Sequence, residues 1–306
     1  MKRNSVLFLM LIFVISFSNI QFGNSQTEGP KTVFWEISGN GLEQSSYLFG
    51  TIHIIPKSDF EAFKIADNKL KDCEQIVFEM AIDVPLKQKI EWAKKLVLPE
   101  GQSIKGFVSA EEYSRLSSYA LDSLEIKEFM FNKYLRLKPF AFYSALIPHV
   151  IGKKIEGYEM HFGKIAKRKK IPVAELESFE IQLAIFDSIP NDKQMEMFFS
   201  EDLDLHKEMD DLLDIYKRQD IYEMASLMNE EESEYNSFEN ELLIQRNKNW
   251  VIKLDDLMRE KSSFIAVGAG HLAGEYGLIR LLREMGFKLE AISIIPEYET
   301  ISSGNN

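Results

Sequence analysis

Cysteine is almost missing from this sequence, because Cys73 is the only one among 306 residues. No disulfide can form within the chain, so its stability must come from a hydrophobic core. A long basic cluster is also missing, and the formal net charge is −12 with a pI near 5.1. This charge balance excludes nucleic acids and anionic membrane surfaces as expected partners.

Long apolar runs are missing beyond Gln26, so we expect no membrane span after that point. The one extended apolar run is Val6–Phe17, which follows two basic residues and is too short to span a bilayer comfortably. Small residues precede Gln26, so we predict that residues 1–25 are a cleaved signal peptide, with an uncleaved anchor as the alternative. The mature domain, residues 26–306, would then be exported to the periplasm or secreted.

Two well-known site motifs do not occur. There is no H-E-x-x-H pair of the zinc peptidases, and the glycines near the C-terminus lack the G-x-G-x-x-G spacing of a dinucleotide site. The chain has instead FIAVGAGHLAGEYGLIRLLREMGF, Phe264–Phe287, which predicts a buried strand, a glycine-rich turn and an amphipathic helix. His271 lies in the turn, at the end of the strand where α/β folds bind ligands.

The same pattern occurs near the N-terminus. Ser46–His53 (SYLFGTIH) predicts a strand that ends in Gly-x-x-His, with Gly50 before His53 as Gly268 is before His271. Because both histidines end apolar strands, we expect them to converge on one site, where they could bind a metal ion or move a proton. The alternative is that the glycines only form turns and the histidines only hydrogen-bond loops.

Three further charged residues are candidates for the site, two because they are expected to be buried and Glu177 because, like the two histidines, it lies at a strand end. Glu79 falls in the predicted central strand Gln75–Asp83, where a carboxylate needs a cation, a metal or several donors. Glu177 follows the short predicted strand Pro172–Leu176. Arg246 falls on the apolar stripe of a helix, so its guanidinium needs a carboxylate or an anionic ligand. Structural ion pairs, or an arginine whose stem covers apolar surface, are the alternatives.

The rest of the chain is predicted to be mainly helical. His161, near the start of a predicted helix Tyr158–Lys170, is a second-rank candidate ligand whose alternative is an exposed side chain. Pro85–Lys138 is expected to be mostly helical, the next helix to end at Pro148, and Asn191–Glu241 to form an acidic helical region. No linker rich in Gly, Ser or Pro divides the chain. We therefore predict one α/β domain, with a mixed β-sheet flanked by helices and a large helical middle section. Further predicted elements are a strand at Thr32–Ser38, a helix from Ser58 or Asp59 to Leu70, and a last strand at Leu289–Ile295.

Longer motifs follow one another along the mature chain. They are YLFGTIH, IVFEM, GYEMHFGKIAKRKKIPVAELESFEIQ, the pair Arg246-Asn247, and VGAGHLAGEYGLIRLLREMGF. In this order they resemble the TraB/GumN family, which is related to the Tiki metalloproteases, and they cover essentially all of the mature chain. The resemblance implies a single α/β domain with a mixed sheet, related to the erythromycin esterase and ChaN-like fold.

The resemblance also implies roles for particular residues. In the Tiki branch, two Gly-x-x-His motifs, a strand glutamate and a late arginine are parts of a metal-dependent peptidase, with manganese or cobalt implicated. The matching positions in this sequence are Gly50, His53, Glu79, Arg246, Gly268 and His271.

The first functional hypothesis is an exported metal-dependent hydrolase, peptidase-like in its chemistry. His53 and His271 would bind a divalent metal, suspected to be manganese or cobalt, with zinc possible. Glu79 would be a ligand or a base, and Arg246 would hold a substrate carboxylate or stabilise an oxyanion. Glu177 would be a further ligand or would orient a histidine. Gly50, Gly268 and His161 complete the predicted substrate-binding or supporting positions.

The second hypothesis is a non-catalytic exported protein that binds a peptide or a small cofactor such as haem with the same histidines. Between the two lies a metal-free hydrolase in which His53 or His271 is the general base. The expected partner is a peptide or another small molecule in each case.

Overall fold

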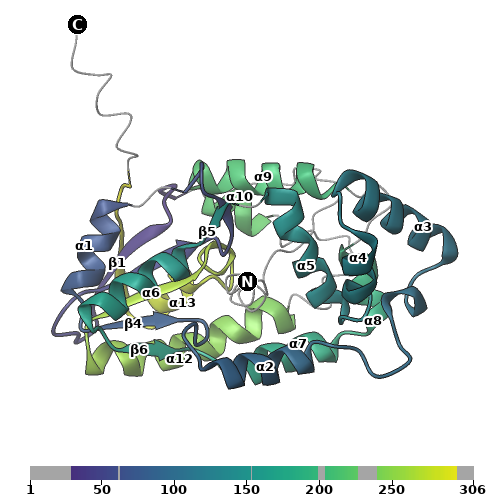
Figure 1. Ribbon diagram of the computed structural model, residues 1–306. Coiled ribbons are helices and arrows are strands. Elements are labelled where there is room, and N and C mark those ends of the chain that lie inside the picture. Colours follow the sequence, from purple (N-terminus) through teal and green to yellow (C-terminus); the bar gives the residue numbers. More distant parts are fainter. Residues whose placement is uncertain (1–28, 61–62, 153, 199–203, 227–239, 295–306) are drawn as a thin grey trace, which may run out of the picture.

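The computed structural model describes residues 29–60, 63–152, 154–198, 204–226 and 240–294 (Figure 1). The predicted signal peptide, residues 1–25, lies outside the described residues. In the part that is described, no helix is both long enough and apolar enough to cross a membrane.

A six-stranded mixed sheet forms the centre of the α/β domain, as predicted. Its strand order is β6-β4-β7-β2-β1-β8, where β1 runs antiparallel to both of its neighbours and β6, β4, β7 and β2 run parallel to one another. The bounds are β1 Phe34–Gly39, β2 Ser46–Thr51, β4 Gln75–Phe78, β6 Val173–Glu175, β7 Ser263–Gly268 and β8 Phe287–Ala291.

The central strands are apolar along their whole length because both faces of the sheet are covered. Every residue of β2 and β4 is buried, as is β7 up to Gly268, which is the pattern of parallel strands between two layers. Phe49 of β2 and Phe264 of β7 stack with ring centroids 6.2 Å apart. Phe162 meets both rings edge-on, which joins the sheet to the next layer.

Two helix pairs pack beside the sheet. The helices α1 (Lys64–Asp72) and α6 (Tyr158–Lys169) contact each other, and α1 also contacts β2 and β7. The second pair is α12 (Gln245–Glu260) with α13 (Leu278–Glu284). Since α12 carries the predicted arginine and α6 follows the GYEM motif, both pairs bring polar residues toward the sheet.

The helical middle section lies between β4 and β7 in sequence. Figure 1 shows its helices α3, α4, α5 and α8 at the end of the molecule opposite α1 and β1. The bounds are α2 Leu86–Lys95, α3 Ala110–Ser118, α4 Glu128–Tyr134, α5 Pro139–Ile151, α7 Phe179–Ser188, α8 Asn191–Phe198, α9 Leu205–Lys217 and α10 Ile221–Ser226. Single turns of 3-10 or π helix are formed by Ile104–Gly106, Tyr119–Ser123, Asn240–Ile244 and Ala269–His271.

Several predicted boundaries are wrong, and the last strand, expected at Leu289–Ile295, is β8 at Phe287–Ala291. The helix expected to end at Pro148 continues to Ile151, because a proline in the last turn removes one backbone hydrogen bond without stopping the turn. The helix expected from Ser58 or Asp59 begins only at Lys64, since the chain first forms a turn at residues 57–59, directly after β3 (Ile55–Pro56). The strand β4 ends at Phe78, so Glu79 follows the strand instead of lying inside it.

Candidate functional site

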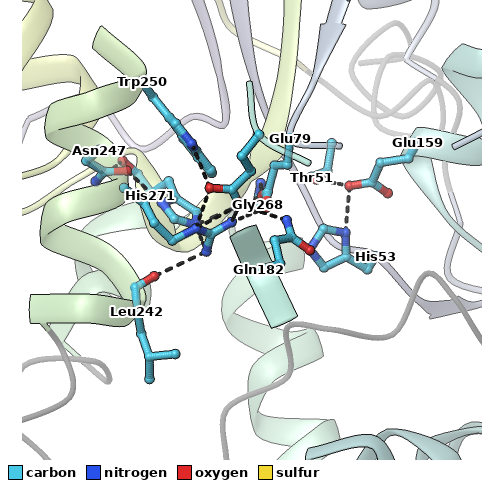
Figure 2. A network of polar contacts seen from close by, with 12 residues as sticks. Thr51, His53, Glu79, Glu159, Gln182, Leu242, Asn247, Trp250, Gly268 and His271 are labelled. Carbon is cyan, nitrogen blue, oxygen red and sulfur yellow. Dashed lines mark hydrogen bonds and ion pairs between the residues drawn. The ribbon is translucent and has the colours of Figure 1, made fainter. Parts of the chain in front are cut away.

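The site lies at the carboxyl ends of three neighbouring strands. In the sheet register Thr51 of β2 is opposite Gly268 of β7, and Phe78 of β4 is opposite Ala266 of β7. The residues that follow these strand ends are therefore neighbours in space. They include His53, Glu79 and His271, which enter the site from strands far apart in the sequence (Figure 2).

The side chains of His53, Glu79 and His271 all lie close to Gly268. Its N–H donates to Glu79 Oε1 at 2.7 Å. A Cβ at this position would lie 3.2 Å from Glu79 Oε1, and 3.7 Å from both His53 Nε2 and His271 Cδ2. Both imidazole rings thus lie against one glycine, and a side chain here would fill the space between them.

Arg246, on α12, contributes a permanently charged guanidinium to the site. Its guanidinium donates to both oxygens of Glu177, to Glu79 Oε2 at 2.8 Å and to the Leu242 carbonyl at 3.1 Å, and it lies 3.3 Å from His271 Nε2. Every N–H of the guanidinium therefore has a partner, and the side chain is 3 % exposed. A substrate carboxylate could bind Arg246 only by displacing one of these partners.

Glu177 is fully occupied by protein donors. Besides Arg246, it accepts from Trp250 Nε1 at 3.1 Å and from Gln182 Nε2 at 2.8 Å. Ser178 caps α7, which carries Gln182. Because Glu177 accepts from these three side chains, the geometry favours a role in holding Arg246 over a role as a direct ligand.

Glu79 is ionised at neutral pH. Burial alone would raise the pKa of its carboxyl, but Arg246 opposes that effect, together with His271, His53 and the Gly268 N–H, and the pKa is lowered to about 2. A group with such a low pKa is a poor proton acceptor near neutral pH. Glu79 is therefore better suited to hold a cation than to act as a general base.

His271 is buried and neutral. Burial and the nearby Arg246 guanidinium lower the pKa of its imidazole to about 3. Its Nδ1 lies 2.6 Å from Asn247 Oδ1, and the ring packs on Trp250 with centroids 4.4 Å apart. The ring position is thus fixed from α12 on two sides.

His53, unlike His271, is protonated at neutral pH. Burial alone would lower the pKa of this imidazole, but the Glu159 carboxylate outweighs burial, and the pKa is raised to about 9. Glu159 Oε1 lies 2.8 Å from His53 Nδ1 and also accepts from the Thr51 hydroxyl. Burial would raise the pKa of Glu159, but His53 and Thr51 lower it. At neutral pH the two side chains form a buried ion pair.

A small two-stranded sheet brings Glu159 to His53. Strand β3, just after His53, pairs antiparallel with β5 (Ile155–Glu156), and α6 begins directly after β5. Gly157 allows this close approach, because a Cβ on it would lie 2.2 Å from the His53 carbonyl oxygen. Two residues of the GYEM motif therefore have a structural role. Gly157 lets the start of α6 approach His53, and Glu159 pairs with His53.

Two predicted positions do not face the shared site. His161 lies two residues after Glu159 on α6, which turns it about 200° around the helix axis. It pairs with Asp67 of α1 at 2.7 Å and packs on Phe60. Gly50 is buried against the turn after β7, where a Cβ would lie 2.9 Å from Leu272. Its small size serves packing.

Glu159 and Asn247 were not predicted from the sequence to be part of the site. Both lie inside motifs that were recognised, GYEM and the Arg246-Asn247 pair. The pattern of strand ends could not reveal them, because each arrives from a helix that packs beside the sheet. Figure 2 shows Glu159 beside His53 on one side of Gly268, and Asn247 beside His271 on the other.

The side chains predicted to hold a metal ion are His53, His271 and Glu79. Within the described ranges, no group of three or more His, Cys, Asp or Glu side chains could hold a metal ion in the arrangement observed. The donor types fit a divalent ion, because each imidazole is held at Nδ1 by a partner. Nε2 of His53 lies near Gly268, whereas Nε2 of His271 accepts from Arg246 and could bind an ion only if Arg246 moved away.

Comparison with known proteins gives one match. A sequence model of the TraB/PrgY/gumN family matches residues 33–291, a span that contains every residue of the site. No curated protein and no solved structure matches the chain.

Proposed function

Since the chain belongs to the TraB/PrgY/gumN family, we propose that it is an exported, metal-dependent hydrolase of peptide-like substrates. The observation that carries the proposal is the meeting of two imidazoles and an ionised carboxylate around Gly268. Two histidines with one carboxylate leave coordination positions open for water and substrate, as a catalytic metal site requires.

His53, His271 and Glu79 would hold the ion, manganese or cobalt in the first instance and zinc as the alternative. When bound, such an ion polarises a carbonyl and lowers the pKa of a bound water toward about 7. His271 is already neutral, but its Nε2 accepts from Arg246, which would have to move away before His271 could be a ligand. His53 is protonated at neutral pH and would have to release its proton, so binding at this site is accompanied by proton release.

Arg246 and Glu177 support the site in this proposal. Arg246 bonds Glu79 and lies against His271 Nε2, and Glu177 holds the guanidinium in place. Because no N–H of Arg246 is left over, its part is to orient Glu79 and to set the charge of the pocket. Recognition of a substrate carboxylate by Arg246 would require it to exchange one of these bonds.

A metal-free hydrolase is the second candidate, with His53 as a general acid in place of the general base expected from the sequence, because the pKa of its imidazole is raised to about 9. An imidazolium whose pKa is about 9 can donate a proton to a leaving amine at neutral pH. Its side chain is 15 % exposed, whereas that of His271 is 2 % exposed. In this case the substrate would contact His53, which would act as a general acid.

The test uses the purified mature protein, residues 26–306, with Mn²⁺. Calorimetry should detect Mn²⁺ binding, and a peptide library should be cleaved when Mn²⁺ is added. His53→Ala and His271→Ala should each lose binding and cleavage, while His206→Ala, which removes an exposed histidine on α9, should keep both.

Each other outcome selects another function. Cleavage without any bound metal, abolished by His53→Ala, supports the metal-free hydrolase. Absence of both metal binding and cleavage in the wild-type protein overturns both hydrolase proposals. Binding of a peptide or of haem that persists after chelation, without turnover, then identifies a binding protein.

A further inference from the structure

The two histidines of the site have matching partners at Nδ1. His271 faces Asn247 and His53 faces Glu159, from helices α12 and α6. Asn247 is fully buried and Glu159 is 7 % exposed. A buried polar group at such a position needs a structural or chemical reason, because leaving water costs it hydrogen bonds.

The hydrogen bonds of Asn247 fix the proton on His271. The amide nitrogen of Asn247 donates to the carbonyl oxygens of Tyr276 at 2.8 Å and of His271 at 3.3 Å. Carbonyl oxygens only accept, so the nitrogen must face them and Oδ1 must face the ring. An amide oxygen also only accepts, so Nδ1 of His271 carries the proton.

The other side of the ring agrees with this tautomer. The guanidinium of Arg246 lies 3.3 Å from His271 Nε2, and it can only donate. Nε2 must therefore hold a lone pair. Both ends of the ring, from independent partners, require the same neutral form with the proton on Nδ1.

Glu159 acts on His53 in the same sense. Its carboxylate accepts from Nδ1 at 2.8 Å, and the Thr51 hydroxyl, which donates to the same oxygen, holds it in place. Nε2 is then the atom of His53 that faces Gly268. When His53 loses one proton, the hydrogen bond to Glu159 keeps the other proton on Nδ1.

We propose that Asn247 and Glu159 are paired positioning residues, which keep a proton on Nδ1 of both imidazoles and so leave Nε2 of each ring as the nitrogen that can release a proton or bind a ligand. The use of the two Nε2 atoms for a metal ion rests on the proposed function, whereas the Nδ1–H form does not. The two partners differ in charge because the two rings differ in charge. His271 is neutral beside the Arg246 cation, so a neutral acceptor is enough, whereas the carboxylate of Glu159 stabilises a protonated His53.

The first experiment reads the tautomer directly. In metal-free protein labelled with ¹⁵N in its histidines, ring spectra near pH 7 should show His271 with its proton on Nδ1, the minor form of free histidine in water. The five histidines can be assigned by single His→Gln variants. Asn247→Asp should keep the Nδ1–H form, and Asn247→Leu should lose it.

The wild-type spectrum decides by itself if the buried Asn247→Leu variant does not fold. A wild-type His271 with its proton on Nε2 overturns the proposal. So does an Nδ1–H signal that persists unchanged in a folded Asn247→Leu protein.

The second experiment measures Mn²⁺ affinity by calorimetry. Asn247→Leu and Glu159→Leu should each weaken binding about 10- to 100-fold, and Glu159→Gln, which keeps an acceptor for Nδ1–H, should recover part of the loss. Unchanged affinity in both Leu variants overturns the positioning role while the hydrolase proposal stands. No binding by the wild type overturns the metal-dependent proposal, and the tautomer result stands separately.

Discussion

Single residues give the two Gly-x-x-His motifs opposite properties. His53 and His271 end equivalent strands, yet the pKa of one is raised to about 9 and that of the other is lowered to about 3. The difference arises from their neighbours, because Glu159 stabilises a cation at His53 while Arg246 penalises one at His271. The sequence motif places a ring, and residues from other elements decide its charge.

Arg246 is the residue whose loss should cost the most stability. Arg246→Met leaves the carboxylates of Glu177 and Glu79 buried without their cation, so we expect a loss of about 3–5 kcal/mol in the free energy of unfolding, measured by urea denaturation. The double variant Arg246→Met with Glu177→Gln should be less destabilised, because one uncompensated charge is gone.

An exposed arginine provides the control for this prediction. Arg280 pairs with Glu284 on the surface of α13, where both side chains are 56 % exposed, so Arg280→Met should change stability by less than about 0.5 kcal/mol. If Arg246→Met is as mild as Arg280→Met, the buried network of Arg246, Glu79 and Glu177 does not contribute the expected stability.

At the scale of elements, the pairing of β3 with β5 is what the sequence could not predict. Each strand has two residues, too few to produce any periodic signal. The strands β2, β4 and β7 and the helix α6 could be predicted, because they are long or have clear apolar patterns. These patterns pointed to His53, Glu79 and His271, which the structure brings together, whereas Glu159, which depends on the small sheet, was not predicted.

Gly157 tests this element directly. In Gly157→Ala the new Cβ would lie 2.2 Å from the His53 carbonyl oxygen, a backbone atom, so α6 must move away from His53. We expect a loss of about 1–3 kcal/mol in the free energy of unfolding, together with a changed ring spectrum of His53. Gly106→Ala is the matched control, since a Cβ there has nothing within 4 Å. Equal stability of the two variants would mean that the helix start tolerates displacement.

At the scale of the whole molecule, the site joins both ends of the described chain and its middle. The order of the strands puts β2 and β7 side by side, and this adjacency explains why histidines from opposite ends of the sequence meet. The repeated Gly-x-x-His pattern predicted that the two histidines converge on one site, but not that β2 and β7 are adjacent strands, since pairing between distant strands leaves no local signal. Arg246 could be predicted as buried from its place on the apolar stripe, whereas its partners depend on how α12 packs.

The pKa values of the site also predict how overall stability depends on pH. The pKa of His53 is raised in the folded protein from 6.5 to about 9, so its contribution is fully present below pH 6.5 and is lost as the pH rises through 9. The lowered pKa of His271 acts at lower pH, where stability falls from pH 6.5 toward 3, and that of Glu79 acts from 4.5 toward 2. Stability due to these three groups should therefore be highest near pH 6.5.

Above pH 6.5 His271 and Glu79 no longer titrate, and comparison with Glu159→Gln separates His53 from Cys73, whose raised pKa lowers the stability of both proteins from about pH 9. Urea unfolding between about pH 6.5 and about pH 10 should show a decrease of up to about 3 kcal/mol in the wild type. Glu159→Gln removes the carboxylate that raises the pKa of His53, so its curve should be much flatter over this range, while His206→Ala should follow the wild type. A wild-type curve as flat as that of Glu159→Gln would show that the pair of His53 and Glu159 is not ionised in the folded protein, and the proton proposed for His53 would have to be abandoned.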